Sequence, residues 1–227
     1  MCGREASFYT WAEVLAFSRP LSFPTPSVDP APNYNRAPSQ KAPVLIAQQN
    51  DICVRELTWG LVPAWATSTQ KLTPSVNARV ETAPEKPSFR DSWKHRRCLI
   101  PSSGYYEWQQ YARKQPYFIR PAETRILMYA GIWDYNEKLG LASYCILTQP
   151  AQGPIAHIHD RMPVMLSPKL LREWLHCMSD DAVQLVRELM PPKLDFYPVS
   201  LAVGNVRNQG SELITEVVPI ISDDLFT

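Results

Sequence analysis

The sequence predicts an α+β protein, a single domain built on a curved, barrel-like, mostly antiparallel sheet with short peripheral helices. Six segments rich in β-branched and aromatic residues occupy the middle of the chain, whereas helix signals occur near its two ends. No Gly/Ser linker, repeat or step in composition divides the 227 residues, a length that suits one large domain or two small ones. We therefore expect one domain over residues 1–227.

The composition is that of a globular protein, with 45% apolar and 20% charged residues. Lysine and arginine number 23 against 22 acidic residues, so the net charge is +1. This excludes a polybasic protein, but it allows one that gathers its basic residues on one face. The 22 prolines against 8 glycines predict stiff turns and edges rather than flexible linkers.

The first element is a short helix. Thr10 followed by Glu13 is a capping box, which predicts a helix that runs through Val14, Leu15 and Phe17. Prolines recur over residues 20–43, which predicts an extended, irregular crossing of the surface.

Strands follow in the middle of the chain, where short apolar and aromatic runs alternate with turn signals. We expect strands at residues 44–47, 53–59, 76–81, 117–120, 126–133 and 143–148.

Two helices are expected late in the chain. Ser167 is an N-cap followed by Pro168 at the first helical position, and this helix ends near Met178. Its apolar face consists of Leu170, Leu171, Trp174 and Leu175. Asp180 or Asp181 caps the next helix, whose apolar residues are Val183, Leu185, Val186 and Leu189, and Pro191 and Pro192 end it.

The cysteine count argues against structural crosslinks. Five cysteines with no CxxC pair disfavour both a disulfide framework and a structural zinc site, and we expect no metal and no small-molecule cofactor. The sequence has no apolar run long enough to span a bilayer, and its start lacks the order of a signal peptide. We expect a soluble, cytoplasmic monomer without a membrane partner.

Cys2 is the sharpest chemical feature. Cysteine is small enough for removal of the preceding Met1 to be expected, which leaves a free α-amine and a thiol on adjacent carbons. With ordinary pKa values of about 8 and about 8.5, each group is partly nucleophilic near neutrality. An aldehyde would form a Schiff base with the amine and then a thiazolidine when the sulfur adds. Alternatively, Cys2 is simply the second residue of a frayed terminus.

Polar residues alternate in the segment at residues 77–81. In a strand, Asn77, Arg79 and Glu81 share one face, which suits a wet, anion-binding site. The solvated outer face of a strand explains the same pattern.

A carboxylate lies between aromatic residues at 104–108. Alternation places Tyr105 and Glu107 on one face of a strand, and Tyr106 and Trp108 on the other. Poor solvation would raise the pKa of Glu107, as a general acid or base requires. The alternative is a surface glutamate beside a structural tryptophan.

His157 and His159 occupy alternate positions near Asp160 and Arg161, which could bias the charge of an imidazole. Metal ligation is disfavoured because no further histidine or cysteine follows at ligand spacing.

Basic residues gather at residues 79–97, where six face three acids, a local charge of +3. A positive groove would add Arg4, Arg36, Arg161 and Arg207 to them, with Trp65 available to stack on bases. The polar run at residues 205–210 is expected to pack against or support the site.

Seven motifs, taken together and in order, resemble the SOS-response-associated peptidase (SRAP) family. They are MCGR at residues 1–4, YNRAP at 34–38, WGLVP at 59–63, NARVET at 77–82, GYYEW at 104–108, HDRMP at 159–163 and VGNV at 203–206. The resemblance extends from residue 2 to about residue 215.

The resemblance implies a protein that shields abasic sites in single-stranded DNA. Cys2 would crosslink to the ring-opened sugar aldehyde through its amine and its sulfur, as a stable thiazolidine. Asn77 would hold Cys2 and the sugar in register, and Glu107 would assist proton transfers. His159 would act as acid and base in ring opening and in reversal of the link.

The family also implies DNA contacts, a single α+β domain with a barrel-like sheet, and a positive channel. Phosphates would be bound by Arg4, Asn35, Arg79 and Arg161, and bases would be met by Pro38, Trp65 and Trp108. The partner is single-stranded DNA with abasic sites, which would bring this cytoplasmic protein to the nucleoid.

Two positions depart from the family pattern. Glu5 stands where relatives usually have an apolar aromatic residue, and it could weaken packing behind Cys2 or repel phosphate. Ala66 follows Trp65 where a second aromatic residue is common, which would reduce stacking.

Two other functions fit the same residues. In an amidase or peptidase with an N-terminal nucleophile, the Cys2 thiol would attack an acyl carbon with its own amine as base, and removal of Met1 could be self-catalysed. In a non-covalent single-strand-binding module, the aromatic and basic residues would suffice.

Overall fold

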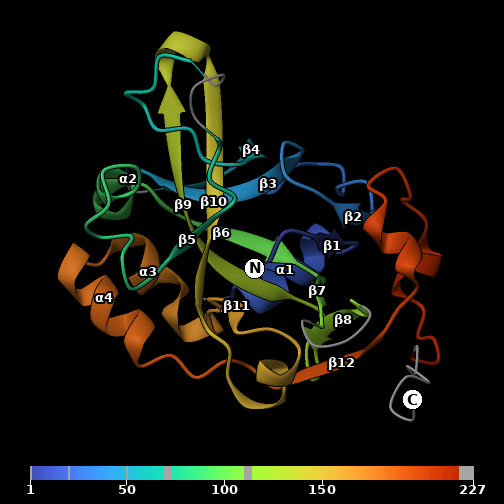
Figure 1. The fold of residues 1–227 in the computed structure, drawn as a ribbon. Coiled ribbons are helices and arrows are strands. Elements are labelled where there is room, and N and C mark those ends of the chain that lie inside the picture. Colours follow the sequence, from blue (N-terminus) through green and yellow to red (C-terminus); the bar gives the residue numbers. More distant parts are fainter. Residues whose placement is uncertain (1, 20, 50, 69–72, 110–113, 220–227) are drawn as a thin grey trace.

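The computed structural model describes residues 2–19, 21–49, 51–68, 73–109 and 114–219 (Figure 1). Met1 and Pro20, on which two of the expectations above fall, lie outside these ranges. The helices are α1 (Trp11–Phe17), α2 (Arg90–His95), α3 (Leu171–His176) and α4 (Ser179–Arg187). Short 3₁₀ turns are η1 (Glu137–Leu139), η2 (Gly153–His157), η3 (Pro168–Leu170), η4 (Leu201–Gly204) and η5 (Ser211–Ile214).

Strands make up the centre of the molecule. They are β1 (Glu5–Ser7), β2 (Asn33–Arg36), β3 (Lys41–Gln48), β4 (Asp51–Trp59), β5 (Asn77–Arg79), β6 (Arg97–Ser102), β7 (Gly104–Trp108), β8 (Pro116–Pro121), β9 (Leu127–Asn136), β10 (Leu141–Pro150), β11 (Arg161–Pro163) and β12 (Leu194–Pro198).

Five strands close into a barrel, in the order β10-β4-β3-β6-β9, with β9 paired back onto β10. Four of the five pairs are antiparallel, and β4 runs parallel to β10. Because the barrel is closed, backbone N–H and C=O groups on both sides of each strand can form hydrogen bonds with a neighbouring strand. The closed sheet also encloses a packed apolar interior.

The long strand β10 places further elements on its two sides. After β4 the chain leaves the barrel at Gly60 and returns as β5, which continues the parallel pairing with Asn77 opposite Ile146. On the other side of β10, β11 extends the line of β9 with Arg161 opposite Pro150. Residues near 77 and near 160 are therefore brought to the same end of one strand.

A second, antiparallel sheet has the order β12-β8-β7-β1-β2. The chain crosses from the barrel into this sheet at Ser103, between β6 and β7. The Ser102 hydroxyl donates to the carbonyl of Ala6 at 3.1 Å and joins the two sheets. Strand β1 lies inside this sheet, between β2 and β7 (Figure 1), so the segment that begins with Cys2 is held on both sides.

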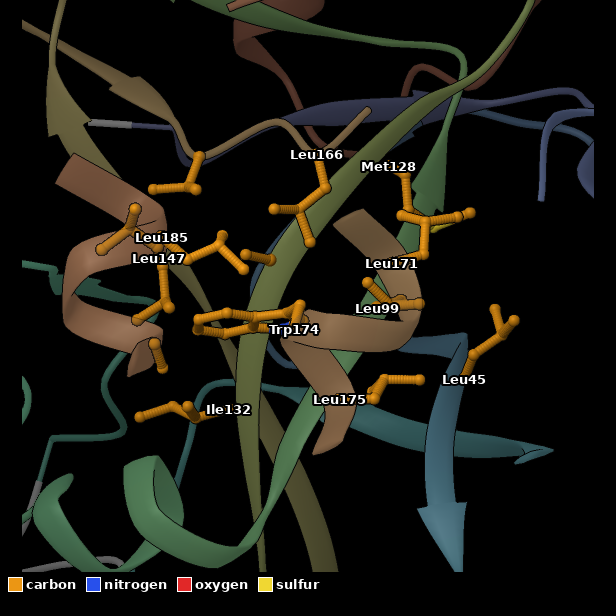
Figure 2. Packing of buried hydrophobic residues seen from close by; sticks show 14 of the residues in the cluster. Leu45, Leu99, Met128, Ile132, Leu147, Leu166, Leu171, Trp174, Leu175 and Leu185 are labelled. Carbon is orange, nitrogen blue, oxygen red and sulfur yellow. The ribbon is translucent and has the colours of Figure 1, made fainter. Parts of the chain in front are cut away.

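The helices cover one side of the barrel. Trp174 of α3 is fully buried among apolar side chains of the strands, with Leu99 of β6 and Ile132 of β9 in the same cluster (Figure 2). Leu185 of α4 belongs to the same cluster. No helix within the described ranges is long and apolar enough to cross a bilayer.

One glycine is required by close packing. A Cβ on Gly104, at the start of β7, would lie 2.5 Å from the ring of Phe118 and 2.7 Å from the carbonyl oxygen of Ile119. Only a residue without a side chain lets β7 approach β8 this closely.

The predicted fold class is confirmed: the chain is an α+β domain with a mostly antiparallel barrel, an antiparallel second sheet and short outer helices. The capping box of Thr10 and Glu13 is present at the start of α1. All six expected strands are found, but the third is shorter than expected: β5 ends at Arg79, and Glu81 lies in the following turn.

The late helices begin differently from expectation. The segment after Ser167 opens as the 3₁₀ turn η3 before α3, and the Ser167 side chain makes no capping hydrogen bond. The N-cap of α4 is Met178, so Asp180 and Asp181 lie in its first turn, where acidic groups favour a helix through its dipole. Residues 21–43 are not wholly irregular, since they contain β2 and the start of β3.

Candidate active site

Cys2 lies three residues before the first residue of β1 and is fully buried, in the apolar cluster that fills the barrel. Its Sγ lies 4.0 Å from the carbonyl oxygen of Arg4. Burial raises the pKa of the thiol well above its usual value, and the nearby carboxylates of Glu107 and Glu5 raise it further. The expectation that this thiol is partly ionised near neutrality is therefore wrong for the folded chain, because its surroundings disfavour a thiolate.

Asn77, the first residue of β5, holds the main chain of Cys2. Its Nδ2 donates a hydrogen bond of 2.8 Å to the Cys2 carbonyl oxygen. The parallel pairing of β5 with β10 places the amide there. A contact with the main chain fixes the position of residue 2 whatever its side chain does.

Glu107 lies in β7 with its carboxyl group buried. Burial raises its pKa to about 7, as the aromatic neighbours in the sequence predicted. The expected alternation is also observed: Tyr105 packs in the cluster that contains Cys2, while Tyr106 and Trp108 pack in a different cluster. A carboxyl group with this pKa can both give and take a proton near neutral pH.

His159 lies between η2 and β11 and faces Glu107, with 4.0 Å between its Nε2 and Oε2 of the carboxyl group. Its Nδ1 accepts a hydrogen bond of 2.9 Å from the backbone N–H of Arg161, so the neutral ring carries its proton on Nε2. Asp160 Oδ1 also lies 2.9 Å from Nδ1, a contact that becomes favourable when the ring is protonated. Burial lowers the pKa of His159, which favours the neutral ring at pH 7.

Arg161 makes a two-pronged ion pair with Glu81. Its Nη1 and Nη2 lie 2.6 and 2.9 Å from the two carboxylate oxygens, and Nη2 also donates to the Thr148 carbonyl at 2.6 Å. Hydrogen bonding to Arg161 lowers the pKa of Glu81. The pair spans β10 and ties the segment that follows Asn77 to the strand that orients His159. Sequence analysis missed it, because 80 positions separate the partners and no local pattern links them.

Arg4 and Asn35 bind the C-terminal part of the chain. Arg4 Nη1 donates to Asn35 Oδ1 and to the Val203 carbonyl, both at 2.7 Å, and Nη2 donates to the Gly204 carbonyl at 3.1 Å. The Asn35 amide donates to the carbonyls of Val203, Asn205 and Asn208. The polar run at residues 205–210 therefore packs against the start of the chain, as its composition suggested.

The remaining predicted DNA-contacting residues are spread over the surface. Arg79 is exposed at the end of β5, Pro38 lies half-buried in the turn between β2 and β3, and Trp108 is half-buried at the end of β7. Trp65 is 57% exposed.

The segment that carries Trp65 is anchored to the β9–β10 hairpin, which projects from the barrel in Figure 1. The Ala64 N–H donates to Asp134, and Asn136 donates to the carbonyls of Pro63 and Ala66. Ala66, the residue after Trp65, is itself buried.

Three arginines of the expected positive groove are used elsewhere. Arg36 is buried in an ion pair with Glu5. Arg97 is buried and donates to the backbone carbonyls of Trp93 and Trp174. Arg96 pairs with Asp91 and Asp134. The count of basic residues therefore overestimates the positive charge available to a ligand, because these three arginines form ion pairs or hydrogen bonds within the protein.

The structure thus gathers Cys2, Asn77, Glu107 and His159 from four separate segments of the chain. A family model described as SOS response associated peptidase (SRAP) matches residues 1–206 of the chain. The chain belongs to the SRAP family.

Relatives of this SRAP chain include two bacterial proteins. Abasic site processing protein YedK of Escherichia coli (strain K12) is 34% identical over 188 residues, which cover 80% of this chain and 83% of YedK. Abasic site processing protein YoqW of Bacillus subtilis (strain 168) is 34% identical over 186 residues, which cover 78% of this chain and 83% of YoqW.

Solved structures share the SRAP fold seen here. A protein from Bacteroides thetaiotaomicron matches with a TM-score of 0.78 at 24% identity, over 96% of this chain and 100% of that one. A phage-related protein from Bordetella bronchiseptica matches with a TM-score of 0.71 at 26% identity, over 87% and 94% of the two chains.

Proposed function

We propose that this SRAP protein processes abasic sites in single-stranded DNA by forming a covalent thiazolidine crosslink through Cys2 after Met1 has been removed. The observation that carries the proposal is the hydrogen bond from Asn77 to the Cys2 carbonyl, beside the facing pair of Glu107 and His159. YedK and YoqW, each named an abasic site processing protein, support the same class of substrate.

The chemistry proceeds in two balanced steps. The α-amine of Cys2 adds to the aldehyde carbon of the opened sugar, and loss of one water leaves an imine. The Cys2 sulfur then adds to the imine carbon and the thiol proton passes to the nitrogen, which closes the five-membered ring without further loss of atoms. Because the pKa of the thiol is raised, the amine acts first and the sulfur follows.

The surrounding groups divide the proton transfers. Asn77 keeps Cys2 in place without taking part in bond making. Glu107, with a pKa of about 7, donates a proton to the departing water and can recover one afterwards. His159 and Glu107 face each other and exchange the proton on Nε2, and through this exchange His159 acts as acid and base in ring opening and in reversal of the link.

DNA binding completes the proposal. Phosphates lie along Arg79, which is exposed, and Arg4, which is partly exposed. Asn35 is fully buried with its amide bonded to backbone carbonyls, and Arg161 is paired with Glu81, so these two residues support the binding surface without contacting phosphate. Bases stack on or wedge against Pro38, Trp65 and Trp108. A single strand gives direct access to the sugar carbon, and binding weakens with salt as phosphate contacts are lost. The protein acts as a monomer.

The test is a denaturing gel with intact-mass analysis after incubation with a single-stranded oligonucleotide that carries one abasic site. Wild type, Cys2→Ala and Cys2→Ser are compared, with a strand of the same sequence that lacks the lesion. We expect a heat-stable adduct for wild type alone, with the mass of protein without Met1 plus DNA minus one water.

Two results would contradict the proposal. An equal adduct from Cys2→Ala would exclude Cys2 as the crosslinking residue. No adduct from wild type shown by mass to lack Met1 would exclude crosslinking, and repeated turnover of an acyl substrate would then favour an N-terminal-nucleophile hydrolase.

A further inference from the structure

We infer that Glu5 and Arg36 form one buried unit next to Cys2 that sets the charge around its sulfur and thereby controls thiazolidine ring closure. The inference rests on the proposed function and adds two positioning residues to it.

The two side chains meet inside the protein. Glu5 is fully buried and Arg36 is 4% exposed, and Arg36 Nη1 donates to Glu5 Oε1 at 2.8 Å. They are direct partners across β1 and β2. The pairing of these strands shifts by one residue between Glu5 and Ser7, so the ion pair marks the register at the end nearest Cys2. The concern that Glu5 would repel phosphate does not apply, because Arg36 neutralises it out of contact with solvent.

The pair lies within electrostatic reach of the Cys2 sulfur. Glu5 is three residues after Cys2 and pairs across the sheet with Tyr105, which packs in the same cluster as Cys2. Tyr129 of β9 belongs to that cluster too, and its pKa is raised first by burial and then by Cys2 and Glu5, so it is near both. The Glu5 charge adds to burial and to Glu107 in raising the pKa of the thiol.

The other titratable groups around the unit are buried tyrosines. Tyr9, Tyr129 and Tyr144 surround the carboxylate, and the pKa of each is raised, first by burial and also by Glu5. Burial lowers the pKa of Arg36, but the charge and the hydrogen bond of Glu5, together with Tyr144 and Tyr9, outweigh that effect and raise the pKa overall. Arg36 is thus the cation that compensates Glu5.

Stability does not account for such a pair. Apolar side chains of similar volume commonly replace a buried ion pair without loss of stability, because desolvation offsets the attraction between the charges. Removing one partner alone leaves a buried charge uncompensated. The effect of having both Glu5 and Arg36 here is on the chemistry of Cys2, because the two opposite charges keep the net charge near its sulfur close to zero.

The inference predicts opposite effects from the two halves of the pair. Glu5→Gln removes the negative charge and leaves Arg36, which favours the thiolate and speeds closure. Arg36→Met leaves the negative charge uncompensated and slows closure, by about tenfold for each pKa unit that the thiol rises. In the double variant Glu5→Gln/Arg36→Met both charges are absent, and closure returns close to the wild-type rate.

The experiment follows the two covalent steps separately on the abasic single strand. Borohydride quenching at short times reduces the imine and counts every protein that has reached the first step, whereas heating without borohydride leaves only the thiazolidine. Cys2→Ser reports the amine step alone, since it has no sulfur. Arg97→Met, which removes a buried arginine from β6, is the matched control for general loss of stability.

The inference is supported if the rate of imine formation stays within about twofold of wild type in all three variants. The rate of ring closure must rise in Glu5→Gln, fall in Arg36→Met and return close to the wild-type rate in the double variant. Equal slowing of both steps in Glu5→Gln, or closure unchanged in both single variants, overturns the inference. If Arg36→Met does not fold, Glu5→Gln decides on its own. Failure of the proposed function looks different: wild type itself then forms no lesion-dependent adduct.

Discussion

The side-chain amide of Asn77 is bonded at 2.8 Å to the main-chain carbonyl of Cys2, although 75 positions separate the two residues. The barrel makes this contact possible, because β10 holds β5 in parallel register next to the start of β1. The bond does not involve the thiol, so Cys2 variants lose their chemistry while the main chain remains held. That separation makes single substitutions at the site informative.

Asn77→Ala removes the donor and should slow crosslinking about fivefold, the effect of about 1 kcal/mol for a lost hydrogen bond. Asn77→Asp should be at least as slow, since an ionised carboxylate cannot donate to a carbonyl. Single-turnover crosslinking measures the rate, and fluorescence anisotropy measures binding to an undamaged strand. A loss of DNA affinity as large as the loss of rate would contradict a role confined to Cys2.

Glu107→Gln should change how stability depends on pH. The carboxyl pKa is raised to about 7 in the folded protein from 4.5 when unfolded, so the folded state holds the proton more tightly. Its contribution to stability is complete below pH 4.5 and is lost as the pH rises through about 7. The free energy of unfolding of Glu107→Gln, relative to that of wild type, should therefore increase by up to about 3 kcal/mol between pH 4 and pH 8, at about 1.4 kcal/mol per pKa unit.

Urea denaturation at a series of pH values checks this shift. Glu81→Gln is the control with the opposite sign, because hydrogen bonding to Arg161 lowers the pKa of Glu81. A constant difference in stability between Glu107→Gln and wild type across the whole range would refute the buried, proton-holding carboxyl.

His159→Ala should slow reversal of the crosslink more than it weakens DNA binding, because the proposed function assigns the imidazole to proton transfer. Release of DNA from purified adduct, chased with excess competitor, measures reversal. His157→Ala is the matched control, since His157 is exposed and only two residues away. Equal effects on reversal and affinity would assign His159 to binding instead.

A blocked amino terminus should abolish the crosslink. Acetylation, or a tag ahead of Met1 that prevents its removal, leaves no free amine to form the imine. The gel assay of the abasic strand reads the result directly. Crosslinking at the full rate by a protein whose tag is shown by mass to be intact would disprove the free-amine mechanism.

Gly104→Ala should destabilise the protein by about 1–3 kcal/mol, because the new Cβ overlaps Phe118 and the Ile119 carbonyl. It should also slow crosslinking, since Gly104 opens the strand that carries Glu107. Thermal unfolding compares it with Gly204→Ala, where a Cβ meets no atom within 4 Å. Equal melting temperatures for the two variants would contradict the required close approach of β7 to β8.

Local signals in the sequence predicted most of the fold. The capping box at Thr10 and the runs of β-branched residues indicate the backbone conformation of the segments in which they lie, which is why α1 and the six strands were predicted. Strands β1, β2, β6, β11 and β12 were not predicted, since each is six residues or shorter and contains a charged residue or a proline. Their conformation comes from pairing with distant strands rather than from propensity.

The site divides in the same way. The aromatic neighbours of Glu107 were enough to predict its raised pKa, because those neighbours are adjacent in sequence. The raised pKa of the Cys2 thiol was not predictable, since it depends on burial inside a barrel formed by residues 41–150. The pairs of Arg36 with Glu5 and of Arg161 with Glu81 depend likewise on strand register.

Arg4 and Asn35 donate hydrogen bonds to backbone carbonyls of residues 203–208, so the pocket around Cys2 is completed only after these late residues have been synthesised. Cys2 leaves the ribosome among the first residues, but the segment that locks its strand is made about 200 residues later. At a rate of roughly 5–20 residues per second this takes about 10–40 s. Under the proposed function, removal of Met1 during that time would free the amine of Cys2 before the pocket that uses it is complete.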